Sequence, residues 1–129
     1  MTVAVAHSDS ARGKAALHAA AKEALLRGES LAVLRIIPGV DEPVDEDPKL
    51  REQVSEELSE YSNLTWELRR GPEGYDTSES LLDLAEEAGA TLLVLGSRKR
   101  RPVGKLILGS VVQRVLLEST IPVLVVKAR

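Results

Sequence analysis

The stretch TLLVLGSRKRRPVGKLILGS, residues 91–110, decides the fold, because it joins a predicted strand to a predicted helix through a basic loop. Residues 91–95 are a short apolar run, which is typical of a strand buried on both faces of a parallel sheet. The basic, glycine-containing loop covers residues 96–105. Ser110 followed by Gln113 is the pattern of a capping box, which predicts that a helix begins there. Strand, loop and helix in this order indicate an α/β fold.

The same alternation runs along the whole chain. Strands are predicted over residues 2–6, 30–37, 64–69, 91–95 and 122–126. Helices are predicted from Ser10 to about Arg27, from Asp47-Pro48 through Tyr61, from Asp76 or Thr77 to Gly89, and from Ser110 to about Glu118. No linker or internal repeat interrupts this order, so we expect one domain over residues 1–129. The alternation predicts an open α/β sandwich, a parallel sheet with helices on both faces.

Two apolar patterns indicate how individual elements face the core. Leu50, Val54, Leu58 and Tyr61 recur at helical spacing, which predicts one buried stripe on the second helix. Residues 64–69 instead alternate between apolar and polar side chains. Such alternation is typical of a half-exposed strand, so we expect this strand at an edge of the sheet.

The composition excludes several classes of function. Of the 129 residues, 43% are hydrophobic and 29% charged, as in an ordinary globular domain. A formal net charge of −3, with one tryptophan, two tyrosines and no phenylalanine, argues against binding to nucleic acids or acidic membranes. Without cysteine there are no disulfides, thiolate nucleophiles or cysteine zinc sites, and two histidines leave little for an imidazole metal site. With no secretory pattern and no apolar run of bilayer length, we expect a cytoplasmic protein.

Two segments are candidates for a binding site, because ligands of such sheets bind beyond the carboxyl ends of the strands, where the strand order reverses. They are residues 6–10, after the first strand, and residues 96–110, after the fourth. The second segment carries the basic side chains Arg98, Lys99, Arg100, Arg101 and Lys105. It ends at Gly109-Ser110, where a helix N-terminus offers N–H groups and partial positive charge to a phosphate. A Walker loop and a G-x-G-x-x-G sequence are both absent.

These residues also have purely structural explanations. Gly96 lets the backbone approach a ligand, but Gly96 and Gly109 equally suit turn geometry or close packing. Ser110 is explained as a helix cap alone. The basic cluster fits a solvated loop, an anion site or a regulatory surface.

The two histidines do not indicate catalysis. His7-Ser8-Asp9 contains the letters of a hydrolase triad, but adjacent residues cannot direct three side chains onto one point. No nucleophile elbow is present either. His7 is a candidate ligand contact, whereas His18, within the first predicted helix, is expected to pack without a particular role.

Nearly the whole chain resembles the universal stress protein family. Three stretches carry the resemblance at the carboxy-terminal half: Gly96-Ser97-Arg98-Lys99, Leu108-Gly109-Ser110-Val111-Val112 and Ile121-Pro122-Val123-Leu124-Val125-Val126. Nucleotide-binding members carry G-x-x-G-x9-G-[ST] at this place. A V-A-V strand start and an acidic loop before the second helix fit as well. The resemblance implies a Rossmann-like, adenine nucleotide alpha hydrolase-like sheet of order 3-2-1-4-5.

The resemblance also implies a non-catalytic stress-response protein that binds AMP or ATP, the latter with Mg²⁺. The implied pocket consists of Ala6, His7, Ile36, Gly96, Arg98, Lys99, Gly109, Ser110 and Val111. Arg98 and Lys99 would neutralise phosphate, and the amides after Gly109 would hold it. This sequence departs from the family pattern at Ala6, where an aspartate usually contacts the nucleoside, and at Lys99, where the second loop glycine usually stands. The alternative is an interaction module of the same fold with a degenerate pocket and no ligand. The sequence leaves open whether the ligand is AMP, ATP, a cyclic nucleotide or an inorganic anion.

The last predicted strand indicates a homodimer. Residues 123–126 are uniformly apolar, and the implied strand order places them at a sheet edge. An apolar, exposed edge invites pairing with another strand. Family members commonly dimerise through this strand, so we expect a symmetric homodimer.

Overall fold

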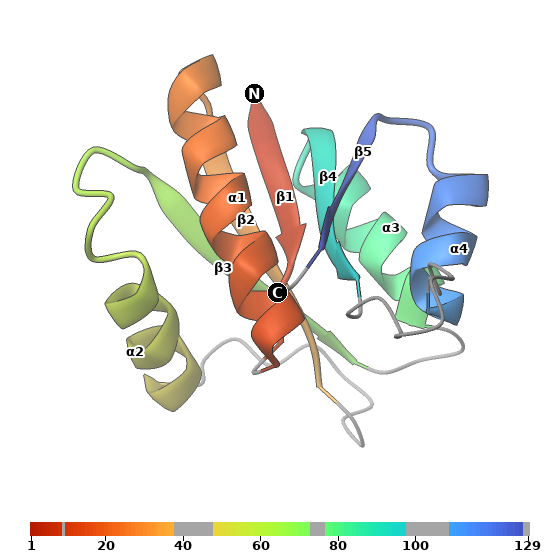
Figure 1. Ribbon diagram of the computed structural model, residues 1–129, viewed down its shortest axis with the longest axis horizontal. Helices are drawn as coiled ribbons and strands as arrows, with labels where there is room; N and C mark the ends of the chain where they lie inside the picture. Colours follow the sequence, from red (N-terminus) through yellow and green to blue (C-terminus); the bar gives the residue numbers. More distant parts are fainter. Residues whose placement is uncertain (9, 38–47, 73–76, 98–108, 128–129) are drawn as a thin grey trace.

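The computed structural model describes residues 1–8, 10–37, 48–72, 77–97 and 109–127. Its parallel sheet has five strands in the order β3-β2-β1-β4-β5, as predicted (Figure 1). The strands are β1 (Thr2–Ala6), β2 (Ser30–Ile37), β3 (Trp66–Pro72), β4 (Ala90–Ser97) and β5 (Val123–Lys127). β1 lies at the centre, and the chain continues to β2 on one side and later to β4 on the other.

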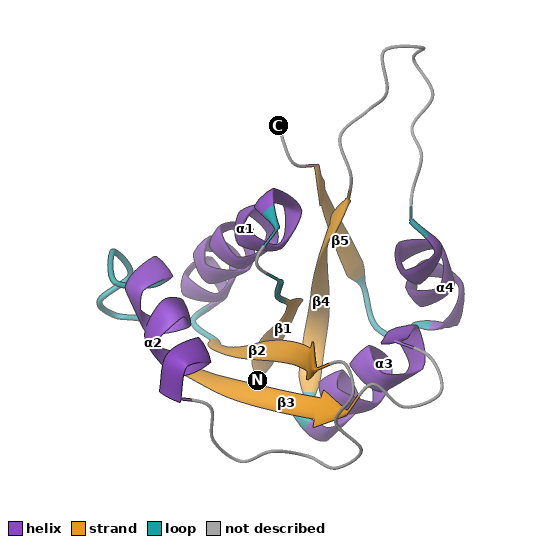
Figure 2. Ribbon diagram, turned by 90° about the horizontal axis from the view of Figure 1, so that it is seen from below, coloured by secondary structure: helices purple, strands orange, loops and turns teal. Residues whose placement is uncertain are grey.

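Helices cover both faces of this sheet, which confirms the open α/β sandwich. The described residues form α1 (Ala11–Arg27), α2 (Pro48–Glu57), α3 (Thr77–Glu87) and α4 (Ser110–Glu118). Figures 1 and 2 show α1 and α2 on one face and α3 and α4 on the other. Each face encloses its own apolar cluster, because successive side chains of a strand point to opposite faces.

The predicted helical stripe is part of the cluster beneath α1 and α2. Leu50, Val54 and Leu58 are buried there, and Tyr61 packs against them partly buried. Small alanines on the inner side of α1 let this helix approach the sheet closely, with Leu17 as the largest fully buried side chain of the helix. The cluster on the other face gathers around Leu34 and Leu93.

The helix ends agree with the predictions from local sequence at some positions and differ from them at one. Ser10 caps α1 by accepting a hydrogen bond from the Gly13 N–H at 3.2 Å, as predicted. Gly28 and Gly89 follow α1 and α3 with φ angles of 66° and 69°, which favour glycine. The predicted capping box is wrong, because Gly109 has the extended backbone of an N-cap and Ser110 is already helical. Gly109 has no side chain, so none at that position accepts from the first-turn N–H groups of α4.

Strand boundaries differ from the prediction by one to three residues, and the largest difference is at the end of β3, which continues to Pro72. β3 begins at Trp66, because the Leu64 N–H donates to the Tyr61 carbonyl (3.0 Å) in a turn before the strand. Pro122 precedes β5, although its carbonyl accepts from the Leu93 N–H at 3.0 Å. β3 does lie at an edge of the sheet. The alternative helix starts Asp47 and Asp76 lie outside the described residues.

Candidate functional site

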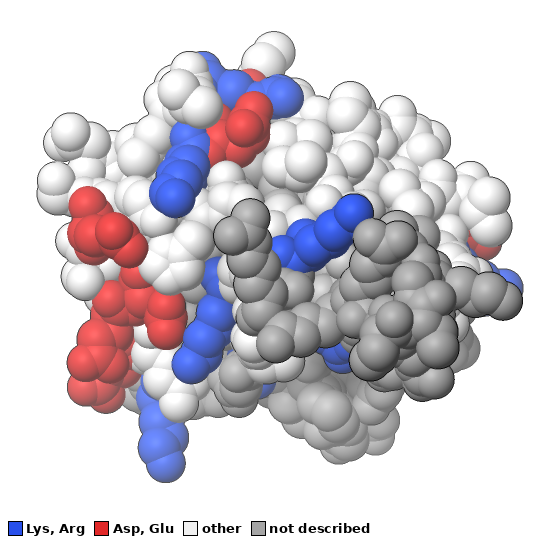
Figure 3. Space-filling view, viewed as in Figure 1, with Lys and Arg blue, Asp and Glu red and all other residues white. Residues whose placement is uncertain are grey.

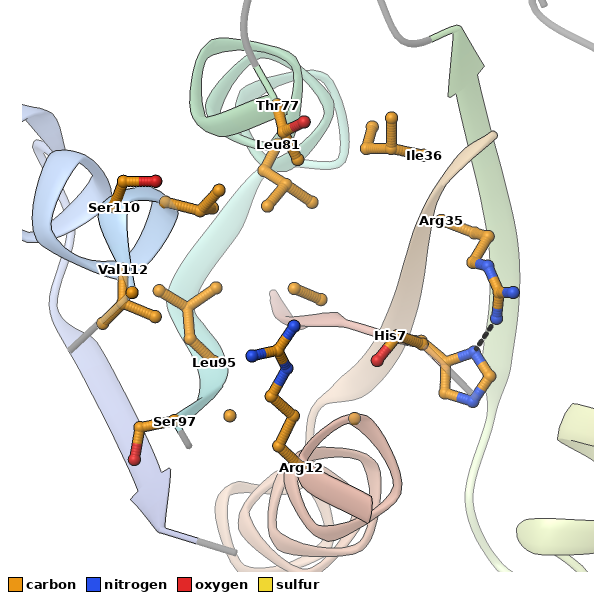
Figure 4. A pocket seen from close by; sticks show the side chains of 16 residues that line it. His7, Arg12, Arg35, Ile36, Thr77, Leu81, Leu95, Ser97, Ser110 and Val112 are labelled. Carbon is orange, nitrogen blue, oxygen red and sulfur yellow. Dashed lines mark hydrogen bonds between the residues drawn. The ribbon is translucent and has the colours of Figure 1, made fainter. Parts of the chain in front are cut away.

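A cavity of about 410 Å³ opens at the carboxyl ends of β1 and β4 (Figure 4). It is lined by Ala6, His7, Ser8, Arg12, Gly13, Arg35, Ile36, Thr77, Leu81, Leu95, Gly96, Ser97, Gly109, Ser110, Val111 and Val112. These residues come from elements on both sides of the central strand β1, where the order of the strands reverses. This is the place at which ligands bind in doubly wound α/β sheets.

The predicted pocket residues converge on this cavity from four separate segments. Ala6, His7, Ile36, Gly96, Gly109, Ser110 and Val111 all line it. Arg98 and Lys99, the predicted phosphate contacts, lie outside the described residues. Convergence places the residues together in space, and their binding roles stay predictions.

One wall of the cavity is apolar. Leu81 on α3, Leu95 on β4 and Val112 on α4 are buried side chains that line it. Ile36, at the end of β2, faces this group from the other side of the cavity in Figure 4. An apolar slot of this kind suits the faces of a flat, largely apolar group such as a nucleobase. Of these apolar residues only Ile36 was predicted from the sequence; Leu81, Leu95 and Val112 were not.

The opposite side of the cavity is cationic. Arg35 donates a hydrogen bond to Nδ1 of His7 at 3.1 Å, and the His7 side chain is buried (Figure 4). Because Nδ1 accepts this bond, the neutral imidazole carries its proton on Nε2. Arg12 extends from the first turn of α1 into the same cavity. Neither arginine is among the residues predicted from the sequence, although Arg12 follows the predicted Ser10 cap and Arg35 precedes Ile36.

Gly96 has a packing role that the sequence left undecided. A Cβ atom at this position would lie 2.7 Å from the carbonyl carbon of Arg12, and closer still to the carbonyl oxygen. The first turn of α1 therefore rests directly on the end of β4. Gly13 is similar, because a Cβ there would collide with Ser8 in the connection from β1. Both glycines hold α1, and with it Arg12, close to the sheet.

A second hollow lies beside α2 and has a polar lining. Its residues are His7, Lys14, His18, Gln53, Glu56, Glu57, Ser59 and Glu60. His7 lines both hollows, so the second lies next to the first.

His18 joins α1 to the end of α2, which corrects the expectation that it packs without a role. Its Nε2 lies 2.9 Å from a Glu57 carboxylate oxygen and its Nδ1 lies 2.8 Å from the Tyr61 hydroxyl. A Glu60 carboxylate oxygen also lies 3.3 Å from Nδ1, so His18 is surrounded by two carboxylates and a hydroxyl. Burial, and then the negative charge of Glu60, raise the pKa of the Tyr61 hydroxyl above its ordinary value, which keeps it a donor.

Other site classes find no support in the described part of the chain. Its His, Asp and Glu side chains form no group of three or more that could hold a metal ion. None of the helices there is long and apolar enough to cross a membrane. In the His7-Ser8-Asp9 stretch, the Ser8 hydroxyl lies 2.7 Å from that of Ser10 and His7 is bonded to Arg35, while Asp9 lies outside the described residues.

A parallel sheet of this strand order, with helices on both faces, defines a doubly wound α/β protein. Its cavity lies where the strand order reverses, which is the usual ligand site of such proteins. A sequence model of the universal stress protein family matches residues 1–127. A universal stress protein of Mycolicibacterium smegmatis is 40% identical over 127 residues, which cover 97% of this chain and 96% of that protein. The chain therefore belongs to the universal stress protein family.

Solved structures agree with this assignment. A universal stress protein from Archaeoglobus fulgidus is 32% identical, with a TM-score of 0.72 and 98% of each chain covered. The universal stress protein from the same organism in complex with dAMP is 28% identical, with a TM-score of 0.71 and again 98% of each chain covered.

Proposed function

We propose that this protein is a non-catalytic, cytoplasmic stress-response protein that binds an adenine nucleotide in the cavity at the ends of β1 and β4. The observation that carries the proposal is the cavity's division into an apolar wall and a cationic side. A nucleotide has the same division, between a flat base and a charged phosphate. The complex of a 28% identical family member with dAMP supports this class of ligand.

The described residues that line the cavity suit such a ligand in two ways. Ile36 and Leu95 would contact the faces of the base. The first-turn N–H groups of α4 follow Gly109 rather than a capping side chain, and they would donate to phosphate oxygens from the wall that faces the arginines, assisted by the Ser110 hydroxyl. Arg98 and Lys99 would add positive charge to the same end.

The lining offers little to a metal ion or to catalysis. Among the described residues that line the cavity there is no aspartate or glutamate. Mg²⁺ prefers carboxylate and phosphate oxygens, so these residues do not form a Mg²⁺ site of their own. Mg²⁺ would enter only with the phosphates of ATP, and we expect AMP to bind without it. A carboxylate base for water activation is also missing from this part of the lining, which supports a binding role.

Adenine nucleotides are expected to raise the melting temperature of the protein saturably. A ligand at a hundredfold excess over its Kd adds about 2.7 kcal/mol to the free energy of unfolding. The measurement is a thermal-shift titration with AMP, with ATP in the presence and absence of Mg²⁺, and with inorganic phosphate. The double variant Arg98→Gln/Lys99→Gln should reduce the shift, whereas Lys22→Gln/Lys49→Gln removes the same charge outside the cavity lining and should not.

Two outcomes would contradict parts of this proposal. If none of these compounds shifts the melting temperature, the cavity binds no adenine nucleotide and the ligand-free interaction module becomes the better description. If the Arg98→Gln/Lys99→Gln variant responds as the wild type does, these two residues do not contact the phosphate.

We further propose that two copies of the chain form a symmetric dimer through β5. β5 is an edge strand whose Leu124 side chain is 38% exposed. In Figure 3, charged side chains gather over α1 and α2, whereas mostly uncharged surface lies over β4 and β5. An uncharged apolar edge is a favourable place for strand pairing.

Leu124→Lys is expected to convert the dimer to monomers in sedimentation velocity experiments, because it places charge on the exposed side of the edge strand. Leu124 is a better choice than Val125, since Val125 packs against the cluster beneath α3 and α4. Leu26→Lys is the control, because Leu26 is 82% exposed and lies in the last turn of α1 rather than on the edge strand. A Leu124→Lys protein that stays dimeric would move the interface to another surface.

A further inference from the structure

Arg12 differs from other arginines of this protein. Its guanidinium reaches into the cavity from α1, between Leu95 and His7 in the view of Figure 4. Arg27 and Arg69, by contrast, donate to the carboxylates of Glu23 and Glu67 at 3.1 and 2.9 Å. Across residues 1–8, 10–37, 48–72, 77–97 and 109–127, no hydrogen bond or ion pair engages the Arg12 side chain.

The surroundings of Arg12 are unfavourable for a cation. It is the second residue of α1, and the first turn of that helix contains no acidic residue. A helix N-terminus carries partial positive charge, so a guanidinium there is repelled rather than stabilised. Arg35 also belongs to the cavity lining, and the described lining contains no carboxylate that would offset the charge of Arg12. A bound anion would provide the missing countercharge.

The backbone holds Arg12 in place. The Ser10 cap fixes the start of α1, and Gly96 lets the Arg12 carbonyl group rest against β4. At the end of β1, Ala6 contributes only a methyl group to the lining, so it offers no polar group there, whereas Arg12 and His7 do. Because the backbone at Arg12 is fixed in this way, the side chain starts from a defined place beside the cavity and no movement of α1 is needed to bring it there.

We propose that Arg12 is a specificity-determining residue, which makes the cavity select a phosphorylated nucleoside over the neutral nucleoside. This inference rests on the proposed nucleotide-binding function and names the group that the site discriminates. The apolar wall contacts the base in both ligands alike, so it cannot distinguish them. The planar guanidinium distinguishes them because it donates two parallel N–H bonds to phosphate oxygens and finds no equivalent partner on a neutral nucleoside.

The test compares adenosine with AMP by isothermal titration calorimetry at one fixed ionic strength. Arg12→Gln is expected to lower the preference for AMP over adenosine about 10- to 100-fold, because a hydrogen-bonded charge pair is lost. Adenosine affinity should change little. Arg12→Lys should restore part of the preference, since it keeps the charge but not the paired donors. Lys22→Gln removes one charge from an exposed position of the same helix and should leave the preference unchanged.

The outcomes separate this inference from the proposed function. An Arg12→Gln protein that binds AMP and adenosine with the wild-type preference overturns the role of Arg12 while the proposed function stands. If the wild type binds neither of these compounds nor ATP, the proposed function fails, and inorganic phosphate then tests Arg12 by thermal shift. Stabilisation by phosphate that Arg12→Gln removes supports an anion-selecting Arg12, and no stabilisation of the wild type by phosphate overturns it.

Discussion

Replacing Gly96 with alanine is expected to lower the free energy of unfolding by about 1–3 kcal/mol, as overpacking of a close contact generally does. The added Cβ would lie 2.7 Å from the carbonyl carbon of Arg12. This neighbour is backbone in the first turn of α1, so no flexible side chain can move aside, and the helix itself must shift. We expect the same displacement to move Arg12 and weaken AMP binding. Urea denaturation measures the first effect and calorimetric titration with AMP the second.

Gly109→Ser is the control for the stability effect. A Cβ at Gly109 meets nothing within 4 Å, its φ of −64° is accessible to any residue, and serine is a favourable N-cap. Its free energy of unfolding is expected to equal or slightly exceed that of the wild type. Equal stability of the Gly96→Ala protein and the wild type would mean that α1 does not approach β4 as closely as the structure shows.

Replacing Leu17 with alanine is expected to lower the free energy of unfolding by about 2–5 kcal/mol, through lost burial and the cavity left behind. Leu17 is fully buried in the cluster that joins α1 to the sheet. Leu26→Ala makes the same chemical change on the same helix at an exposed position, so its effect is expected to stay within about 0.5 kcal/mol. Chemical denaturation of the two variants side by side is the measurement, and similar losses in both would contradict the burial assignment.

The Gly96 and Leu17 variants both change the packing of α1 against the sheet, and the candidate site depends on that packing. α1 carries Arg12 into the cavity, and Ser10 and Gly13 at its start connect it to the end of β1. The opposite wall comes from α3, β4 and α4. The cavity is thus bounded by elements from both faces of the sheet, and a shift of α1 changes its cationic side without altering the apolar wall.

The alternation of strand and helix patterns predicted the order of the elements along the chain, and the resemblance to the universal stress protein family implied the strand order of the sheet. Local signals were sufficient for the helix ends at Ser10, Gly28 and Gly89, because capping and left-handed φ angles involve only neighbouring residues. The capping box at Ser110 failed because Gly109 takes the extended N-cap conformation one residue earlier. Sequence pattern does not decide between two adjacent caps when both residue types are acceptable there.

Contacts between residues far apart in the chain were decided only by the tertiary structure. The bonds of His18 to Glu57 and Tyr61 span 39 and 43 residues, and Gly96 meets Arg12 across a still longer separation. The sequence placed a site near residues 6–10 and 96–110 because strand ends must gather at one edge of a parallel sheet. It could not show that Arg12 points into that site, or that no described residue there is its partner. The direction and the partners of a side chain depend on how the helix packs on the sheet, and the spacing of apolar residues in the sequence does not determine that packing.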